Sequence, residues 1–139
     1  MNIEEQLASH PAALEVFIVE GSSDVRERLE ELVGSIAGAR CAGTAGTVDE
    51  ALGGIRTTRP DAVILDIGIS EGRGFDVIRA LHGSHPDIPI YVLSNLVLEP
   101  YRRLAAKLGA SAFYDKSTQM EQLRAVLARS AAQYTTLTH

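Results

Sequence analysis

The sequence predicts an α/β protein with a mostly parallel sheet, because short apolar runs alternate with segments of helical length. Five runs rich in β-forming residues are the expected strands: 15–19, 41–45, 62–65, 88–93 and 112–114. Five helices are expected between and after them. Regular strand–helix alternation requires parallel strands with helices on both faces of the sheet. A chain of 139 residues fits one such domain.

Three helix starts are marked by capping-box patterns, in which a polar residue is followed three positions later by Glu. These patterns are Asp24-x-x-Glu27, Thr47-x-x-Glu50 and Thr118-x-x-Glu121. Apolar residues then recur at helical spacing, which predicts faces that pack on a sheet. The predicted buried faces are Val25, Leu29, Leu32, Val33 and Ile36 in the first helix, Phe75, Ile78 and Leu81 in the third, and Leu123, Val126 and Leu127 in the last.

The α/β pattern places one domain at residues 14–132, which leaves short segments at both ends. Residues 1–13 form an N-terminal extension, for which an extra helical turn is expected. Residues 133–139 (QYTTLTH) are expected to form a frayed, flexible tail.

Composition and charge exclude several classes of function. The net charge is −5 and no basic cluster occurs, which argues against direct binding of nucleic acid. No apolar run approaches the roughly 18 residues of a membrane span, and the N-terminus lacks the pattern of a signal peptide. We therefore expect a cytoplasmic protein. The single cysteine excludes an internal disulfide, and the four histidines lack the spacing of metal ligands.

Four of the expected strands are followed by, or end on, residues that carry chemistry: Glu20, Asp66, Ser94 and Lys116. Ligands of open parallel sheets bind at the carboxyl ends of the strands, so we expect these side chains to lie on one rim. An aspartate is a competent nucleophile toward a phosphoryl group, and an ammonium and a hydroxyl are suitable partners for phosphoryl oxygens. The pattern therefore indicates phosphoryl acceptance on a carboxylate.

With these residues in place, residues 15–132 resemble the receiver domain of two-component response regulators. The similar segments are VFIVEGSSDVRERL, DAVILDIGISEGRGFDVIRAL, IPIYVLSN and GASAFYDKS. The resemblance implies a flavodoxin-like, doubly wound sheet of five parallel strands in the order 2-1-3-4-5. It also implies a histidine kinase or a phosphotransfer protein as the phosphoryl donor.

The resemblance assigns a role to each matching residue. Asp66 stands at the phosphoacceptor position, Ser94 at the switch hydroxyl, Phe113 at the switch aromatic, and Lys116 at the phosphoryl charge partner. The implied Mg²⁺ ligands are the carboxylates of Glu20 and Asp66 and the backbone carbonyl of Gly68. Gly74 matches the glycine of the acceptor loop.

The chain departs from the family pattern at four positions. Gly21 replaces the second acid after the first strand, Ser70 and Ser117 stand where prolines are usual, and Asn95 follows the switch hydroxyl where a small residue is usual. Losing one carboxylate from a site for a divalent ion predicts about ten- to thirty-fold weaker binding of Mg²⁺. Asp24 is the acid that could compensate, although its position favours a helix cap.

Two functions follow from this pattern. The first is a single-domain receiver that accepts phosphate on Asp66 and signals by protein contact through its fourth helix, fifth strand and fifth helix, with no enzymatic activity beyond transfer to and hydrolysis from its own aspartate. The second is a phosphate-independent adaptor with an eroded acid pocket. An unidentified downstream protein is implied in either case, and the resemblance allows a homodimer. A nucleotide-binding enzyme is disfavoured because no glycine-rich phosphate loop is present.

Overall fold

The computed structural model describes residues 12–138 and places five parallel strands in one sheet in the order β2-β1-β3-β4-β5, as predicted. The strands are β1 (Leu14–Val19), β2 (Ala39–Ala45), β3 (Ala62–Leu65), β4 (Ile90–Ser94) and β5 (Ala112–Asp115). The helices are α2 (Ser23–Gly34), α3 (Val48–Thr58), the short α4 (Ile69–Gly72), α5 (Gly74–Ser84), α6 (Glu99–Leu108) and α7 (Met120–Thr138).

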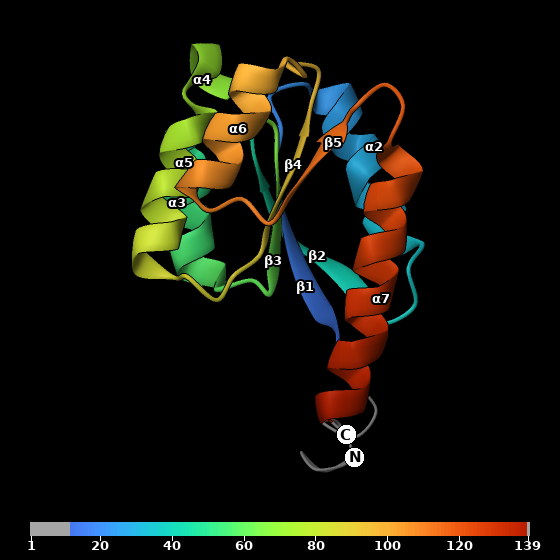
Figure 1. Cartoon of the computed structure of the whole chain (residues 1–139). Helices are drawn as coiled ribbons and strands as arrows, with labels where there is room; N and C mark the ends of the chain where they lie inside the picture. The colour runs from blue at the N-terminus through green and yellow to red at the C-terminus, as the bar shows by residue number, and fades with distance from the viewer. Residues whose placement is uncertain (1–11, 139) are drawn as a thin grey trace.

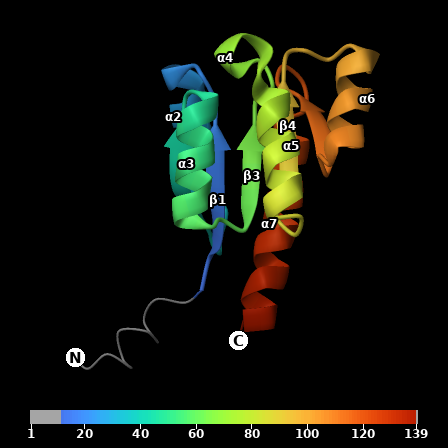
Figure 2. The same ribbon diagram turned by 90° about the vertical axis from the view of Figure 1, so that its left-hand side faces the viewer.

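The helices form a layer on each face of the sheet (Figure 1). One face is covered by α3, α5 and α6, and the other by α2 and α7. Figure 2 looks onto the α3 and α5 side. The two layers follow from the right-handed connections between parallel strands, which place successive helices on opposite faces when the strand order reverses.

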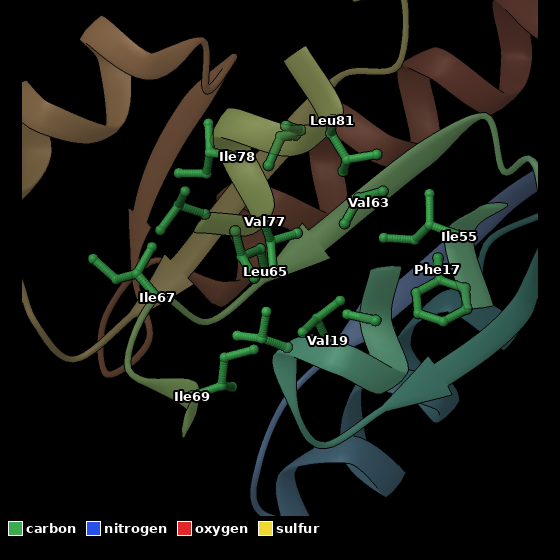
Figure 3. Close-up of a cluster of buried hydrophobic side chains, with 14 of the residues drawn as sticks. Phe17, Val19, Ile55, Val63, Leu65, Ile67, Ile69, Val77, Ile78 and Leu81 are labelled. Atoms are coloured by element: carbon green, nitrogen blue, oxygen red, sulfur yellow. The ribbon is translucent and has the colours of Figure 1, made fainter. Parts of the chain in front are cut away.

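Two apolar clusters fill the spaces between the sheet and its helices. In the first, shown in Figure 3, Val19, Val63 and Leu65 of the sheet pack against Ile55 of α3 and Val77 of α5. The second cluster joins the opposite face to α2 and α7 and contains most of the predicted helix faces. All four residues of β3 are buried, as expected for a central strand covered on both sides.

The predicted helix starts are partly confirmed. Thr47 caps α3, and its Oγ1 accepts the Glu50 N–H at 3.2 Å. The prediction for α2 is wrong: Ser22 is the N-cap and accepts the Val25 N–H, so Asp24 lies in the first turn, where its charge favours the helix dipole. Helix α7 begins at Met120, two residues after the predicted cap.

The structure describes only part of the two predicted end segments. The extra helical turn falls largely on residues 1–11, which lie outside the described residues. Residues 133–138 of the segment expected to form a flexible tail are helical, because α7 continues to Thr138. Tyr134 packs on the second cluster, which gives this part of the helix apolar contacts with the sheet layer. Within residues 12–138, no helix is both long enough and apolar enough to cross a membrane.

The ring of Phe17 is buried in space that two glycines leave open. A Cβ atom at Gly54 of α3 would lie 2.6 Å from Phe17 Cζ, and one at Gly43 of β2 would lie 2.9 Å from Phe17 Cε2. Gly53, next to Gly54 in the same helix, is exposed and has no atom within 4 Å of the equivalent point. Only one of these adjacent helical glycines is therefore required by packing.

We predict opposite effects of alanine at the two positions. Gly54→Ala overpacks the Phe17 site and lowers the free energy of unfolding by about 1–3 kcal/mol. Gly53→Ala reduces the entropy of the unfolded chain and therefore raises the free energy of unfolding by about 0.5–1 kcal/mol. Urea unfolding followed by circular dichroism measures both variants. Equal effects of the same sign would contradict this account of the core.

Candidate functional site

The four polar residues predicted at strand ends lie together at the carboxyl edge of the sheet. Glu20 directly follows β1, Asp66 follows β3, Ser94 ends β4, and Lys116 follows β5. These strands are consecutive neighbours in the sheet order β1-β3-β4-β5. The strand order therefore brings residues that are up to 96 positions apart in the chain together in one cluster.

Lys116 joins the two carboxylates. Its Nζ lies 3.0 Å from Glu20 Oε2 and 3.2 Å from Glu20 Oε1, and 2.9 Å from Asp66 Oδ2. The side chains of Lys116, Glu20 and Asp66 are 12%, 4% and 16% exposed. Of the two carboxylates, that of Asp66 is therefore more exposed to solvent than that of Glu20.

The other oxygen of Asp66 accepts two hydrogen bonds. Ser94 Oγ donates to Asp66 Oδ1 at 3.1 Å, and the Gly68 N–H donates to the same oxygen at 2.9 Å. Ser94 is fully buried, and its Oγ also accepts the Leu96 N–H at 3.1 Å. Every side-chain partner of Asp66 in this cluster was a candidate from the sequence.

The charges of the cluster perturb one another. Burial raises the pKa of Glu20 above the usual 4.5, and the nearby charge of Asp66 acts in the same direction, whereas the hydrogen bond from Lys116 lowers it. Burial alone would lower the pKa of Lys116. Its hydrogen bonds to Asp66 and Glu20 outweigh burial, and its pKa lies above the usual 10.5. Lys116 therefore stays charged, with a formal total of −1 for the three groups.

At Gly21, the missing acid leaves room beside the cluster. An added Cβ would meet only Gly46 O at 3.8 Å and Ile69 Cγ2 at 4.0 Å, which are ordinary contacts. Arg26 holds this loop from α2, because its Nη1 donates to the carbonyls of Glu20 at 2.8 Å and Gly21 at 3.3 Å. Asp24 is exposed in the first turn of α2.

The donor set for Mg²⁺ consists of oxygens, which suits the ion, but it is short of charge. In the described part of the chain, no three His, Cys, Asp or Glu side chains are grouped to hold a metal. Glu20 and Asp66 supply two carboxylates, both already bonded to Lys116. The Gly68 carbonyl, the third predicted ligand, accepts the Gly72 N–H at 3.3 Å and has a second lone pair. These residues could hold an ion whose remaining coordination positions are filled by water or by oxygens of a phosphoryl group.

The loop after Asp66 has a conformation that the sequence does not reveal. Ser70 and Glu71 are both left-handed, with φ of 47° and 61°. A proline could not adopt this φ, so the loss of the family proline at position 70 permits the turn. Ser70 Oγ in turn accepts the Val48 N–H at 3.1 Å, which ties the acceptor loop to the start of α3.

A pocket of about 440 Å³ opens beside Asp66. Its wall includes Phe75 of α5 and Tyr101 of α6, whose rings stack with centroids 6.5 Å apart. Its lining residues are Asp66, Gly68, Glu71, Gly72, Phe75, Ser94, Asn95, Leu96 and Tyr101. The pocket provides a route from solvent to the exposed edge of the Asp66 carboxylate.

Two further predicted features lie next to the cluster. Phe113 of β5 is partly buried against the first apolar cluster, and the guanidinium carbon of Arg102 lies 4.6 Å from its ring centroid. Ser117 Oγ donates to Asn95 Oδ1 at 3.2 Å, so two of the departures from the family pattern contact each other. No local sequence pattern predicts the role of Arg102, because its partners, Val97 and Phe113, come from two separate segments.

Comparison with known proteins agrees with this geometry. The family model described as response regulator receiver domain matches residues 16–128. The chain is 32% identical over 114 residues to the DNA-binding transcriptional activator DevR/DosR of Mycobacterium tuberculosis, covering 81% of this chain and 52% of that protein. It is 24% identical over 110 residues to the response regulator GacA of Pseudomonas viridiflava, covering 79% of this chain and 51% of that protein.

Solved structures show the same fold. The BeF3-activated N-terminal receiver domain of Klebsiella pneumoniae RstA superposes with a TM-score of 0.75 at 26% identity, covering 84% of this chain and 97% of that one. A LuxR-family DNA-binding response regulator from Staphylococcus aureus gives a TM-score of 0.77 at 19% identity, covering 85% and 98%. The chain spans about half the length of the curated relatives named above. By its sequence match and its fold, the chain belongs to the response regulator receiver domain family.

Proposed function

We propose that this receiver accepts a phosphoryl group on Asp66 and signals through contacts with another protein. The observation that carries the proposal is the joint contact of Asp66 with Lys116 at 2.9 Å and Ser94 at 3.1 Å. A cation and a hydroxyl donor thus already stand at the two oxygens of one partly exposed carboxylate. These are the groups that phosphoryl transfer to a carboxylate requires.

In the proposed step, a carboxylate oxygen of Asp66 attacks the phosphorus of the donor. An O–P bond forms as the bond from phosphorus to the donor nitrogen or oxygen breaks, and the donor leaves with that electron pair. The pocket beside Phe75 and Tyr101 gives the donor access to Asp66. Catalysis in such transfers comes mainly from positioning and from neutralising the phosphoryl oxygens.

Lys116 and Ser94 act on the phosphoryl group rather than on the donor. The ammonium group of Lys116 replaces its hydrogen bond to Asp66 Oδ2 with one to a phosphoryl oxygen and keeps its hydrogen bonds to Glu20. Ser94 exchanges its acceptor Asp66 Oδ1 for a phosphoryl oxygen, a charge-assisted bond contributing about 1.5–3 kcal/mol. This is less than the roughly 5.5 kcal/mol needed for a complete two-state switch, so Lys116 and Phe113 would have to supply the remainder of a complete switch.

Receiver domains generally bind Mg²⁺ in their acidic pocket. Here Glu20, Asp66 and the Gly68 carbonyl would hold the ion, which when bound neutralises charge on the transferring group. The place of Gly21 near this set supports weak binding, since one carboxylate fewer faces the ion.

Receiver domains interact with histidine kinases or phosphotransfer proteins and are generally cytoplasmic, non-enzymatic signalling modules. We propose such a donor for this chain, a cytoplasmic location, and an output face formed by α6, β5 and α7. Leu98 at the N-cap of α6 and Leu104 within α6 are exposed apolar residues of one of these elements.

The proposal is tested by incubating the protein with acetyl phosphate and Mg²⁺ and measuring its intact mass. The wild type is expected to gain one phosphoryl group, and Asp66→Asn none, because the amide is not a nucleophile toward phosphorus. Asp76→Asn, which changes a half-exposed aspartate of α5 that pairs with Arg73 and Arg79, serves as the matched control and labels like the wild type. An unlabelled wild type, or labelling that survives Asp66→Asn, would refute phosphoryl acceptance at this residue.

A second candidate is the phosphate-independent adaptor. It is favoured by the small number of acids at the site and by Lys116, which already neutralises part of the charge of Glu20 and Asp66. In that case the cluster has a structural role and the output face works without modification.

Restoring the missing acid separates these two functions. Gly21→Asp fits without a clash and adds a ligand charge, so we expect half-maximal labelling at about ten- to thirty-fold lower Mg²⁺. The measurement is a titration of Mg²⁺ in the acetyl phosphate reaction, with Gly21→Asn as the uncharged control. The adaptor function is favoured if Gly21→Asp is labelled while the wild type stays unlabelled at every Mg²⁺ concentration.

The raised pKa of Glu20 predicts a dependence of stability on pH. A carboxyl group whose pKa is higher in the folded state binds more protons there, so native stability falls as pH rises from about 4.5 through that pKa. Relative to Glu20→Gln, the wild type should therefore be less stable at pH 7 than at pH 4.5. Urea unfolding at both pH values measures the difference, and Glu27→Gln, at an exposed position of α2, controls for net charge. The prediction is contradicted if the wild type becomes more stable, relative to Glu20→Gln, as the pH rises from 4.5 to 7.

A further inference from the structure

The side chain of Arg102 connects two parts of the site that lie on different elements. From the first turns of α6, its Nε donates to the Val97 carbonyl at 2.9 Å, in a partly buried position. Its guanidinium carbon lies 4.6 Å from the ring centroid of Phe113 on β5, within the range of a cation–π contact. Arg102 thus holds the loop 95–98 to the aromatic ring of the neighbouring strand.

The loop 95–98 is also bonded to the phosphoacceptor through Ser94. Ser94 Oγ donates to Asp66 Oδ1 and accepts the Leu96 N–H, both at 3.1 Å. A movement of this hydroxyl toward a group on Asp66 therefore changes its bond to Leu96. The Val97 carbonyl that Arg102 binds lies two peptides further along the chain.

No side-chain cap fixes this loop at the start of α6. Leu98 is the N-cap and provides no side-chain hydrogen bond to the helix, and Pro100 at the second position has no N–H to donate. Arg102 therefore supplies, from within the helix, a side-chain bond that the cap lacks. Because the same guanidinium covers the Phe113 ring, a displacement of the Val97 carbonyl changes the surroundings of that ring.

We propose that Arg102 is a positioning residue that transmits the movement of Ser94 to Phe113. The inference rests on the proposed phosphorylation of Asp66 and adds a specific link between the loop 95–98 and the aromatic ring. The path runs from Asp66 through Ser94 to the Leu96 N–H, along the backbone to the Val97 carbonyl, and from there through Arg102 to Phe113.

Selective labelling makes this link measurable, because the chain has only three phenylalanines: Phe17, Phe75 and Phe113. Protein with ¹³C-labelled phenylalanine is examined by NMR before and after acetyl phosphate and Mg²⁺, and intact mass gives the phosphorylated fraction. In the wild type, the Phe113 ring signals shift on phosphorylation and those of the core residue Phe17 do not. The Arg102→Gln protein is still phosphorylated, but the change in chemical shift of its Phe113 ring signals is smaller by about two-fold or more.

Arg103→Gln is the matched control. It removes the same charge from the adjacent residue of α6, whose side chain is 75% exposed and contacts Glu99 at 3.8 Å. It should preserve the full Phe113 shift. Arg102→Lys keeps the charge but lacks the planar group, so it gives an intermediate shift and carries the test if Arg102→Gln does not fold.

The outcomes separate the two proposals. A phosphorylated Arg102→Gln protein with an undiminished Phe113 shift overturns the role of Arg102 and leaves phosphoryl acceptance intact. A wild type that acquires no phosphoryl group overturns the proposed function, and the transmission with it. A reduced shift in Arg103→Gln equal to that in Arg102→Gln also overturns the proposal, since the effect would then follow from charge alone.

Discussion

The ammonium group of Lys116 lies between two carboxylates that would otherwise repel each other at the edge of the sheet. It is within 3.2 Å of Glu20 and Asp66, and all three side chains are largely shielded from water. Attraction is stronger in such surroundings than in bulk solvent, and so is the cost of leaving a charge unpaired. The positions of the two carboxylates and the orientation of Asp66 toward Ser94 depend on this contact, which also limits the rise in the pKa of Glu20 that burial causes.

The same contact explains how the site tolerates the loss of an acid at Gly21. With two carboxylates and one lysine, the cluster carries a formal charge of −1, which a buried edge accommodates more easily than −2. We propose that the attraction for a divalent cation is correspondingly weaker. Phosphoryl transfer to Asp66, as proposed, would then depend more on Lys116 and Ser94.

The sequence was sufficient for the parallel sheet, the strand ends and the four clustered side chains, because each follows from hydrophobic period and from the rule that ligands meet the carboxyl ends of strands. It did not reveal the left-handed turn at Ser70 and Glu71, whose stabilising bond comes from the backbone of α3. The cap at Ser22 was missed because several adjacent residues have capping side chains. Contacts such as that of Arg102 with Phe113 depend on tertiary packing, which no local pattern records.

We propose that Asp66, rather than its partner Glu20, accepts the phosphoryl group. Both carboxylates contact Lys116, but the side chain of Asp66 is 16% exposed and that of Glu20 only 4%. The most direct measurement is borohydride reduction of protein treated with acetyl phosphate, followed by peptide mass mapping, because reduction converts an acyl phosphate into an alcohol. The account predicts homoserine at position 66 and unchanged glutamate at position 20. Reduction at Glu20, or at neither residue, would contradict it.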